Sequence, residues 1–147
     1  MRTFIYACLV LALLAIGCQK PQPQAINAPL AFYVVSDQPI DGGRFIDTQD
    51  LPKLGYVAAK PDLDITMLKE VYPQSNGLAV AFGTEDAKAF ASLTEKSIGK
   101  RLLVVVGDKP ASAPKIMAPI EGGCLLIQFL DQADLKRAEN DLKKLIY

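Results

Sequence analysis

Five consecutive apolar residues, Leu102 to Val106, constrain the fold of this chain more than any other feature. Successive side chains of a strand point to opposite faces, so a run without a polar residue is typical of a strand buried on both sides. We therefore expect residues 102–106 to lie in the centre of a sheet. Gly107-Asp108 and three prolines follow this run. Because proline removes a backbone donor, the segment after residue 106 is not expected to form another central strand.

Further strands are predicted before and after this run. Residues 30–36 are rich in aromatic and β-branched side chains, and residues 124–130 form another apolar run. Residues 64–83 indicate two strands around a Pro-Gln-Ser-Asn-Gly turn, with a helix over 64–71 as the alternative. A short strand ended by Pro61 is expected within 55–61, and residues 44–63 otherwise show no clear pattern.

Two helices are predicted from apolar spacing and from residues that favour helix ends. Thr84 is expected to cap the first helix, and Gly99 to end it. Asp131 is expected to cap the second, with Asp134 in its first turn. The apolar positions are Ala87, Phe90, Ala91 and Ile98 in the first helix, and Leu135, Ala138, Leu142, Leu145 and Ile146 in the second. This order of elements predicts an α+β fold, with two helices packed on one face of a mainly antiparallel sheet.

Composition limits the function. The chain has 147 residues, half of them apolar, which suits one domain with its own core. Lys plus Arg equals Asp plus Glu at 16 each, so no basic excess indicates nucleic acid. Histidine is absent, which removes the commonest general base and metal ligand. Asp62-x-Asp64 lacks the further ligands of a calcium loop, so we expect no metal. We also expect no catalytic residue and no cofactor.

The first 18 residues differ from the rest. Arg2 precedes an apolar run that ends at Gly17-Cys18 and is shorter than the about 20 residues that span a bilayer. The letters LLAIGC resemble the lipobox of bacterial lipoproteins, although Ala15 stands where leucine is commonest. The resemblance implies cleavage before Cys18 and lipidation of that residue. The alternative is a plain signal or anchor with an incidental cysteine.

The lipoprotein interpretation divides the chain into three parts: a signal peptide over 1–17, a tether rich in proline and glutamine over 18–29, and a folded domain over 30–147. Gln19 in place of aspartate does not indicate inner-membrane retention, so we expect a lipid anchor in the outer membrane, facing the periplasm. Cys124 then has no partner for a disulfide, and we expect it to be buried as a small hydrophobic group.

Short motifs follow one another between residues 90 and 123. They are Phe90-Ala91 with Leu93-Thr94, Gly99 to Leu102, Ser112-Ala113-Pro114 with Ile116, and Ile120 with Gly122-Gly123. Together they resemble the head subdomain of the first periplasmic domain of SecD and SecDF, and the likeness covers about residues 64 to 146. Gly107-Asp108 reverses the usual turn of that family, and Pro110 replaces a β-branched or aromatic residue. The chain also has no second apolar run of spanning length, unlike SecD.

The resemblance implies a domain that is associated with moving polypeptide. The candidate polypeptide-binding residues are Ile116, Met117, Ile120, Gly122 and Gly123, in a loop where polar residues are usual. Alternatively, the apolar side chains fold back over the edge of the sheet. We expect a lipid-anchored, non-catalytic binding module for extended or unfolded polypeptide, or for an export or assembly complex of the envelope. The other hypothesis is a structural or accessory lipoprotein that keeps only the fold.

Overall fold

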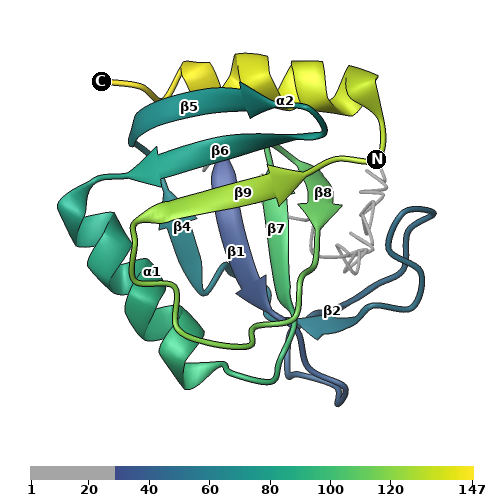
Figure 1. The fold of residues 1–147 in the computed structure, drawn as a ribbon. Helices are drawn as coiled ribbons and strands as arrows, with labels where there is room; N and C mark the ends of the chain where they lie inside the picture. Colours follow the sequence, from purple (N-terminus) through teal and green to yellow (C-terminus); the bar gives the residue numbers. More distant parts are fainter. Residues whose placement is uncertain (1–28) are drawn as a thin grey trace, which may run out of the picture.

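The computed structural model describes residues 29–147, and the predicted signal peptide and Cys18 lie outside them. Nine strands and two helices are formed in the described part of the chain (Figure 1). Their order is β1 (Leu30–Val34), β2 (Arg44–Ile46), β3 (Gly55–Val57), β4 (Leu63–Ile65), β5 (Leu68–Gln74), β6 (Gly77–Phe82), α1 (Thr84–Lys96), β7 (Leu102–Val106), β8 (Lys109–Ser112), β9 (Cys124–Gln128) and α2 (Gln132–Lys143). None of the helices in this part is long and apolar enough to cross a membrane.

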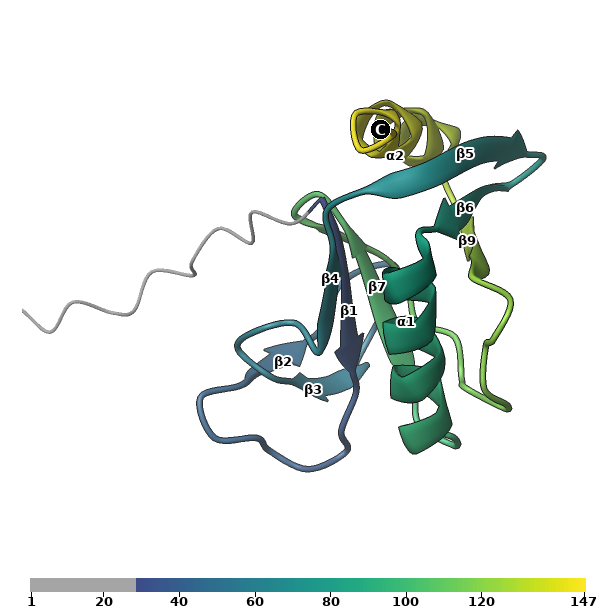
Figure 2. The same ribbon diagram turned by 90° about the vertical axis from the view of Figure 1, so that its left-hand side faces the viewer.

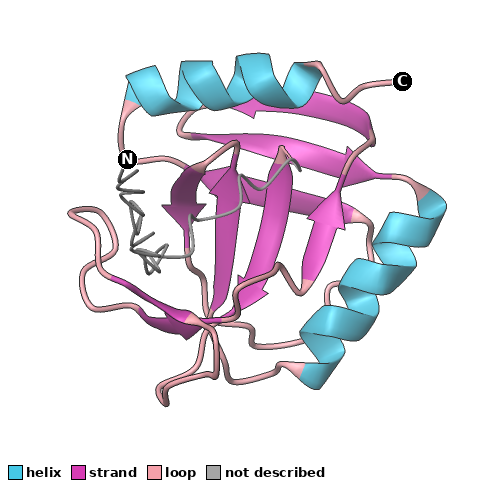
Figure 3. Cartoon of the chain, turned by 180° about the vertical axis from the view of Figure 1, so that it is seen from behind, coloured by secondary structure: helices cyan, strands magenta, loops and turns pink. Residues whose placement is uncertain are grey.

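The strands form three antiparallel sheets, which confirms the predicted α+β class but divides the expected sheet (Figure 3). The four-stranded sheet has the order β4-β1-β7-β8, and the three-stranded sheet has the order β5-β6-β9. Strands β2 and β3 form a separate hairpin. Both helices contribute to the core on one face of the four-stranded sheet, and neither contributes to the other face.

Strand β7 lies between β1 and β8, and all five of its residues are buried, as predicted. It pairs along its whole length with β1, from Leu30 opposite Val106 to Val34 opposite Leu102. Alternate residues of β7 belong to two different cores, because Val104 packs on one face and Val105 on the other. The absence of polar residues in this run is therefore explained by apolar layers on both sides.

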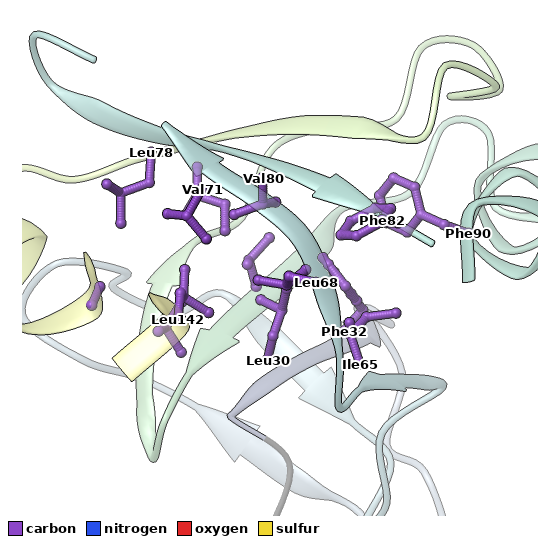
Figure 4. Packing of buried hydrophobic residues seen from close by; sticks show 14 of the residues in the cluster. Leu30, Phe32, Ile65, Leu68, Val71, Leu78, Val80, Phe82, Phe90 and Leu142 are labelled. Carbon is purple, nitrogen blue, oxygen red and sulfur yellow. The ribbon is translucent and has the colours of Figure 1, made fainter. Parts of the chain in front are cut away.

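The main core lies between the four-stranded sheet, the three-stranded sheet and the helices (Figure 4). Three aromatic rings meet in it: the centroid of Phe32 lies 4.8 Å from Phe90 and 6.1 Å from Phe82, and those of Phe82 and Phe90 are 5.1 Å apart. Each comes from a different element, so these rings join β1, β6 and α1.

The second core covers the other face of the four-stranded sheet. Tyr33 and Leu103 contribute to it from the sheet, and Ile46 and Val57 from the β2-β3 hairpin. The hairpin explains why residues 44–63 have little periodicity, because its strands have three residues each. Among residues 29–147, the buried Tyr33 hydroxyl has no hydrogen-bond partner. Burial raises the pKa of this phenol, and the Arg44 guanidinium, 5.5 Å from the ring centroid, partly offsets that effect.

Residues 64–83 form strands, so the alternative helix over 64–71 is wrong. The turn at Ser75-Asn76 joins β5 to β6 as expected. The segment before it crosses from one sheet to another, because β4 pairs with β1 whereas β5 pairs with β6 (Figure 2). Apolar alternation does not reveal this change of sheet, since Ile65 and Leu68 pack in the same core.

The helix termini agree with the predictions in part. The Asp131 carboxylate accepts a hydrogen bond of 2.6 Å from the Ala133 amide, so this cap is confirmed. Thr84 was the wrong cap for α1: Gly83 occupies that position and forms no side-chain bond. Gly99 has a φ of 85°, the left-handed conformation expected after a helix. Ile98 lies beyond α1 and is half exposed, because the helix ends earlier than predicted.

Candidate functional site

The apolar residues of the loop between β8 and β9 do not form one exposed surface. Ile116 is only 4% exposed and packs in the main core, and Ile120 is partly buried against that core. Met117, by contrast, is 75% exposed. Most of the loop's apolar surface therefore folds back over the domain, and the polypeptide-binding role of these residues stays a prediction.

Hydrogen bonds hold this loop against α1 and the start of β7. The Ile116 amide donates to the Lys100 carbonyl, and the Gly99 amide donates to the Ile116 carbonyl, both at 2.8 Å. Further along, the Ile120 amide donates to the buried Thr94 hydroxyl oxygen at 2.9 Å. Pro110 is accommodated because β8 is an edge strand of its sheet in the described part of the chain. These hydrogen bonds fix the backbone of the loop against the rest of the domain.

Gly122 and Gly123 line an open groove of about 460 Å³ between α1 and residues 121–124. In Figure 2 the loop that leads into β9 runs beside α1. Small side chains line the groove: Ala87 and Ala91 on the side of the helix, and Ala81 on the side of the sheet. Lys69, Lys88 and Glu121 add charges to its lining.

The two glycines have different roles in this groove. Gly123 has a φ of 63°, and a Cβ placed on it would lie 3.0 Å from the Ala87 Cβ. Its carbonyl accepts a hydrogen bond of 2.8 Å from the Phe82 amide. A glycine is thus needed here to bring the segment against α1. Gly122 would have open space around an added Cβ, so its backbone is accessible.

Cys124 is exposed, so the expectation of a buried side chain was wrong. It pairs with Ala81, and two residues on, Leu126 pairs with Ala79. These residues lie on the outer face of the three-stranded sheet, whose inner face carries Leu78, Val80 and Ile127. Because the apolar run of β9 lacks polar alternation, its pattern does not indicate that this face is open.

The open face extends the groove across the sheet. Tyr72 lies opposite Ala79, which in turn lies opposite Leu126, and the two larger side chains are 47% and 48% exposed. This row lies beside the row of Ala81 and Cys124 on the same face of the sheet, two residues further along the strands. Sequence patterns did not reveal these positions, since their exposure depends on which sheet β5 and β9 join.

Among residues 29–147, no group of three or more cysteine, aspartate or glutamate side chains is placed to hold a metal ion.

Comparison with protein-family models gives no match. Two curated proteins are similar in sequence, and both are subunits of a protein translocase. The SecD subunit of Acetobacter pasteurianus is 30% identical over 106 residues, and that of Acidaminococcus fermentans is 32% identical over 63 residues. These matches cover 70% and 43% of this chain. The domain is SecD-like.

The matched region is only a part of SecD. It spans 18% of the length of the first relative and 15% of the length of the second. The SecD-like domain is thus related to components of protein export, as its motifs indicated.

Two solved structures of SecDF share the fold. One, described as a membrane component that enhances protein export, gives a TM-score of 0.59 at 21% identity and covers 82% of this chain and 64% of that one. The other, in a super-membrane-facing form, gives 0.56 at 22% identity and covers 82% and 19%. This likeness shows that the fold is shared over 82% of this chain.

Proposed function

We propose that this domain is a non-catalytic binding module of the bacterial cell envelope that holds extended or unfolded polypeptide. The observation that carries the proposal is the open groove between α1 and residues 121–124, in a domain similar to a translocase subunit. The candidate residues Gly122 and Gly123 belong to it. An accessory protein that keeps only the fold is the competing function.

The chemistry of the groove suits a sequence-tolerant contact. Ala81, Ala87 and Ala91 present small apolar side chains, and Gly122 leaves backbone accessible. An extended chain could lie over these residues and reach the apolar row of Tyr72 and Leu126. No deep aromatic pocket is formed by these residues, so binding should be weak.

Met117 is the loop residue best placed to take part. It is exposed, and its flexible thioether side chain suits partners of varied shape. Ile116 and Ile120 instead support the loop from beneath, because they pack on the main core. A charged residue at either position would test folding rather than binding.

The test is a titration of a fluorescently labelled, unfolded model polypeptide with the full chain, in which fluorescence anisotropy measures binding. A Gly122→Asp, Cys124→Asp variant places charges in the groove at two exposed positions. The control is Leu130→Asp, which introduces a charge at an apolar residue that is 86% exposed and lies outside the groove. Loss of binding in the double variant alone supports the proposal. Equal affinity in all three proteins, with circular dichroism unchanged, contradicts it and favours the accessory function.

We also propose that a lipid on Cys18 anchors the domain in the outer membrane on the periplasmic side. The support is the apolar run that ends in a lipobox-like LLAIGC. Cys18→Ser should abolish acylation and lipoprotein-type cleavage. Mass spectrometry of protein from the membrane fraction provides the measurement, and wild-type protein without lipid would contradict the anchor.

A further inference from the structure

A positively charged hollow lies at the end of β1 opposite to Leu30. Its volume is about 500 Å³. Three segments supply its cations: the connection between β2 and β3, the link from α1 to β7, and the loop after β8. The cations are Lys53, Lys100, Arg101 and Lys115, and Asp37 is the one carboxylate in its lining.

Backbone hydrogen bonds fix the segments that carry these cations. The Val35 amide donates to the Arg101 carbonyl at 2.9 Å. The backbones of Arg101 and Lys115 form an isolated antiparallel β-bridge. On the other side, the Lys53 amide donates to the Asp47 carboxylate at 3.0 Å. Lys53 has a φ of 48°, a left-handed conformation that a lysine rarely adopts. The hollow is therefore framed by ordered backbone and not by loose loops.

The four cations have no ion-pair partner among residues 29–147. Five other cations of this part do form such pairs, for example Lys109 with Asp134. The whole chain carries equal numbers of acidic and basic residues, so the cations gather here without a general basic excess. Their mutual repulsion, with only Asp37 to offset it, favours a bound anion.

We propose that this hollow binds a small ligand that carries a phosphate group. The Arg101 guanidinium can donate two parallel hydrogen bonds to one phosphate, and the lysines supply point charges around it. The volume lies within the range of about 300–1,000 Å³ that is usual for small-molecule sites. It therefore leaves room for a further substituent beside the phosphate.

The site is separate from the polypeptide groove. The groove uses Thr84 to Ala91 of α1, whereas the hollow begins at Gly99, beyond the other end of the helix. Between Ala91 and the end of α1 at Lys96 the helix extends for about 8 Å, and no residue lines both sites. The two proposals can therefore fail independently.

The experiment is a titration of the isotope-labelled full chain, in zwitterionic detergent, with inorganic pyrophosphate and glycerol phosphate as probes. Amide resonances of Lys53, Lys100, Arg101 and Lys115 should shift together and saturate, and binding should weaken as sodium chloride is added. An Arg101→Gln, Lys115→Gln variant should lose affinity by about tenfold or more, because both removed charges face the anion. Lys53→Gln, in another segment, should weaken binding to a smaller extent.

The matched control is Lys96→Gln, Lys136→Gln, which removes the same charge from exposed positions outside the hollow. It should bind like the wild type. In a second arm, the micelles receive phosphatidylglycerol or, as control, phosphatidylcholine. Shifts with the soluble probes alone indicate a soluble phosphate ester, and shifts with phosphatidylglycerol indicate a phospholipid headgroup. Absence of saturable shifts in both arms, or equal affinity in the hollow variant and the control variant, overturns the proposal.

Discussion

Gly123 is a position at which the loop after β8 passes α1 without room for a side chain. A side chain there meets both a left-handed backbone and the Ala87 Cβ at 3.0 Å. We expect Gly123→Ala to lower the free energy of unfolding by about 1–2 kcal/mol, mainly through the backbone conformation. Urea unfolding measures the change. Gly122→Ala, where an added Cβ meets open space, is the matched control, and an equal loss in both variants would contradict the role of Gly123.

Phe90 lies fully buried where α1 meets the two larger sheets. Its ring contacts those of Phe32 and Phe82, so truncation leaves a cavity that no single element can fill. Phe90→Ala should cost roughly 3–5 kcal/mol in the free energy of unfolding. A cost below about 1 kcal/mol would show that the three rings do not pack together as described.

Single residues were predicted well where a local interaction decides their state. The Asp131 cap and the left-handed Gly99 depend on neighbours in the sequence, and both are confirmed. Cys124 and Ile116 depend on the sheet beneath them, and sequence alone could not place them. Thr84 was misplaced because capping at Gly83 needs no side chain.

At the scale of elements, an ion pair between Lys109 and Asp134 connects the edge strand β8 to α2. The Lys109 Nζ lies 2.6 and 2.7 Å from the two carboxylate oxygens of Asp134. The hydrogen bond from Lys109 lowers the pKa of Asp134 below 3.8, with a further contribution from the Arg137 charge, although partial burial opposes the shift. The folded protein thus favours the ionised carboxylate more than the unfolded chain does.

This pair predicts a pH dependence of stability. Because the folded pKa is depressed, the contribution is present above pH 3.8 and is lost as pH falls through the lower folded value. In Asp134→Asn the urea midpoint should be lower at neutral pH, and part of its acid decline should vanish. Urea midpoints between pH 7 and pH 2.5 provide the test, with Asp41→Asn in an exposed turn as control. Parallel curves for wild type and Asp134→Asn would contradict the pair's role.

Elements were predicted from periodicity, and their partners were not. The strand within 64–74 was expected, yet its division into β4 and β5 follows from pairing with different sheets. Likewise, apolar spacing placed Ala87 and Ala91 on one face of the first helix, but it did not show that they line a groove. Their partial exposure results from the small residues opposite them, at Gly122 and Gly123.

At the scale of the whole molecule, α2 closes the main core. Leu135, Ala138 and Leu142 are buried against strands of both larger sheets. A chain that ends after residue 131 should therefore lose cooperative unfolding, because it exposes the core face of β5 and β6 to water. Thermal melting followed by circular dichroism measures this. A sharp transition in the shortened chain would show that α2 only covers a core that is already complete.

The fold class and the likeness to SecD were accessible from sequence, since both rest on local motifs and on element order. The arrangement of three sheets, the groove and the charged hollow were not. Each of these joins segments that are distant in the chain, such as Lys53 and Lys115 at the hollow.

The central pairing of β1 with β7 also determines when the domain can form. Leu30 lies opposite Val106, and the strand on the other side of β1, β4, ends at Ile65. In a chain that emerges N-terminus first, β4 can pair with one side of β1 early, but the side that pairs with β7 stays open until residue 106 has followed. Closing so long a loop before its contacts form slows folding. The four-stranded sheet should therefore be completed only late in the emergence of the chain, after β7 has joined β1.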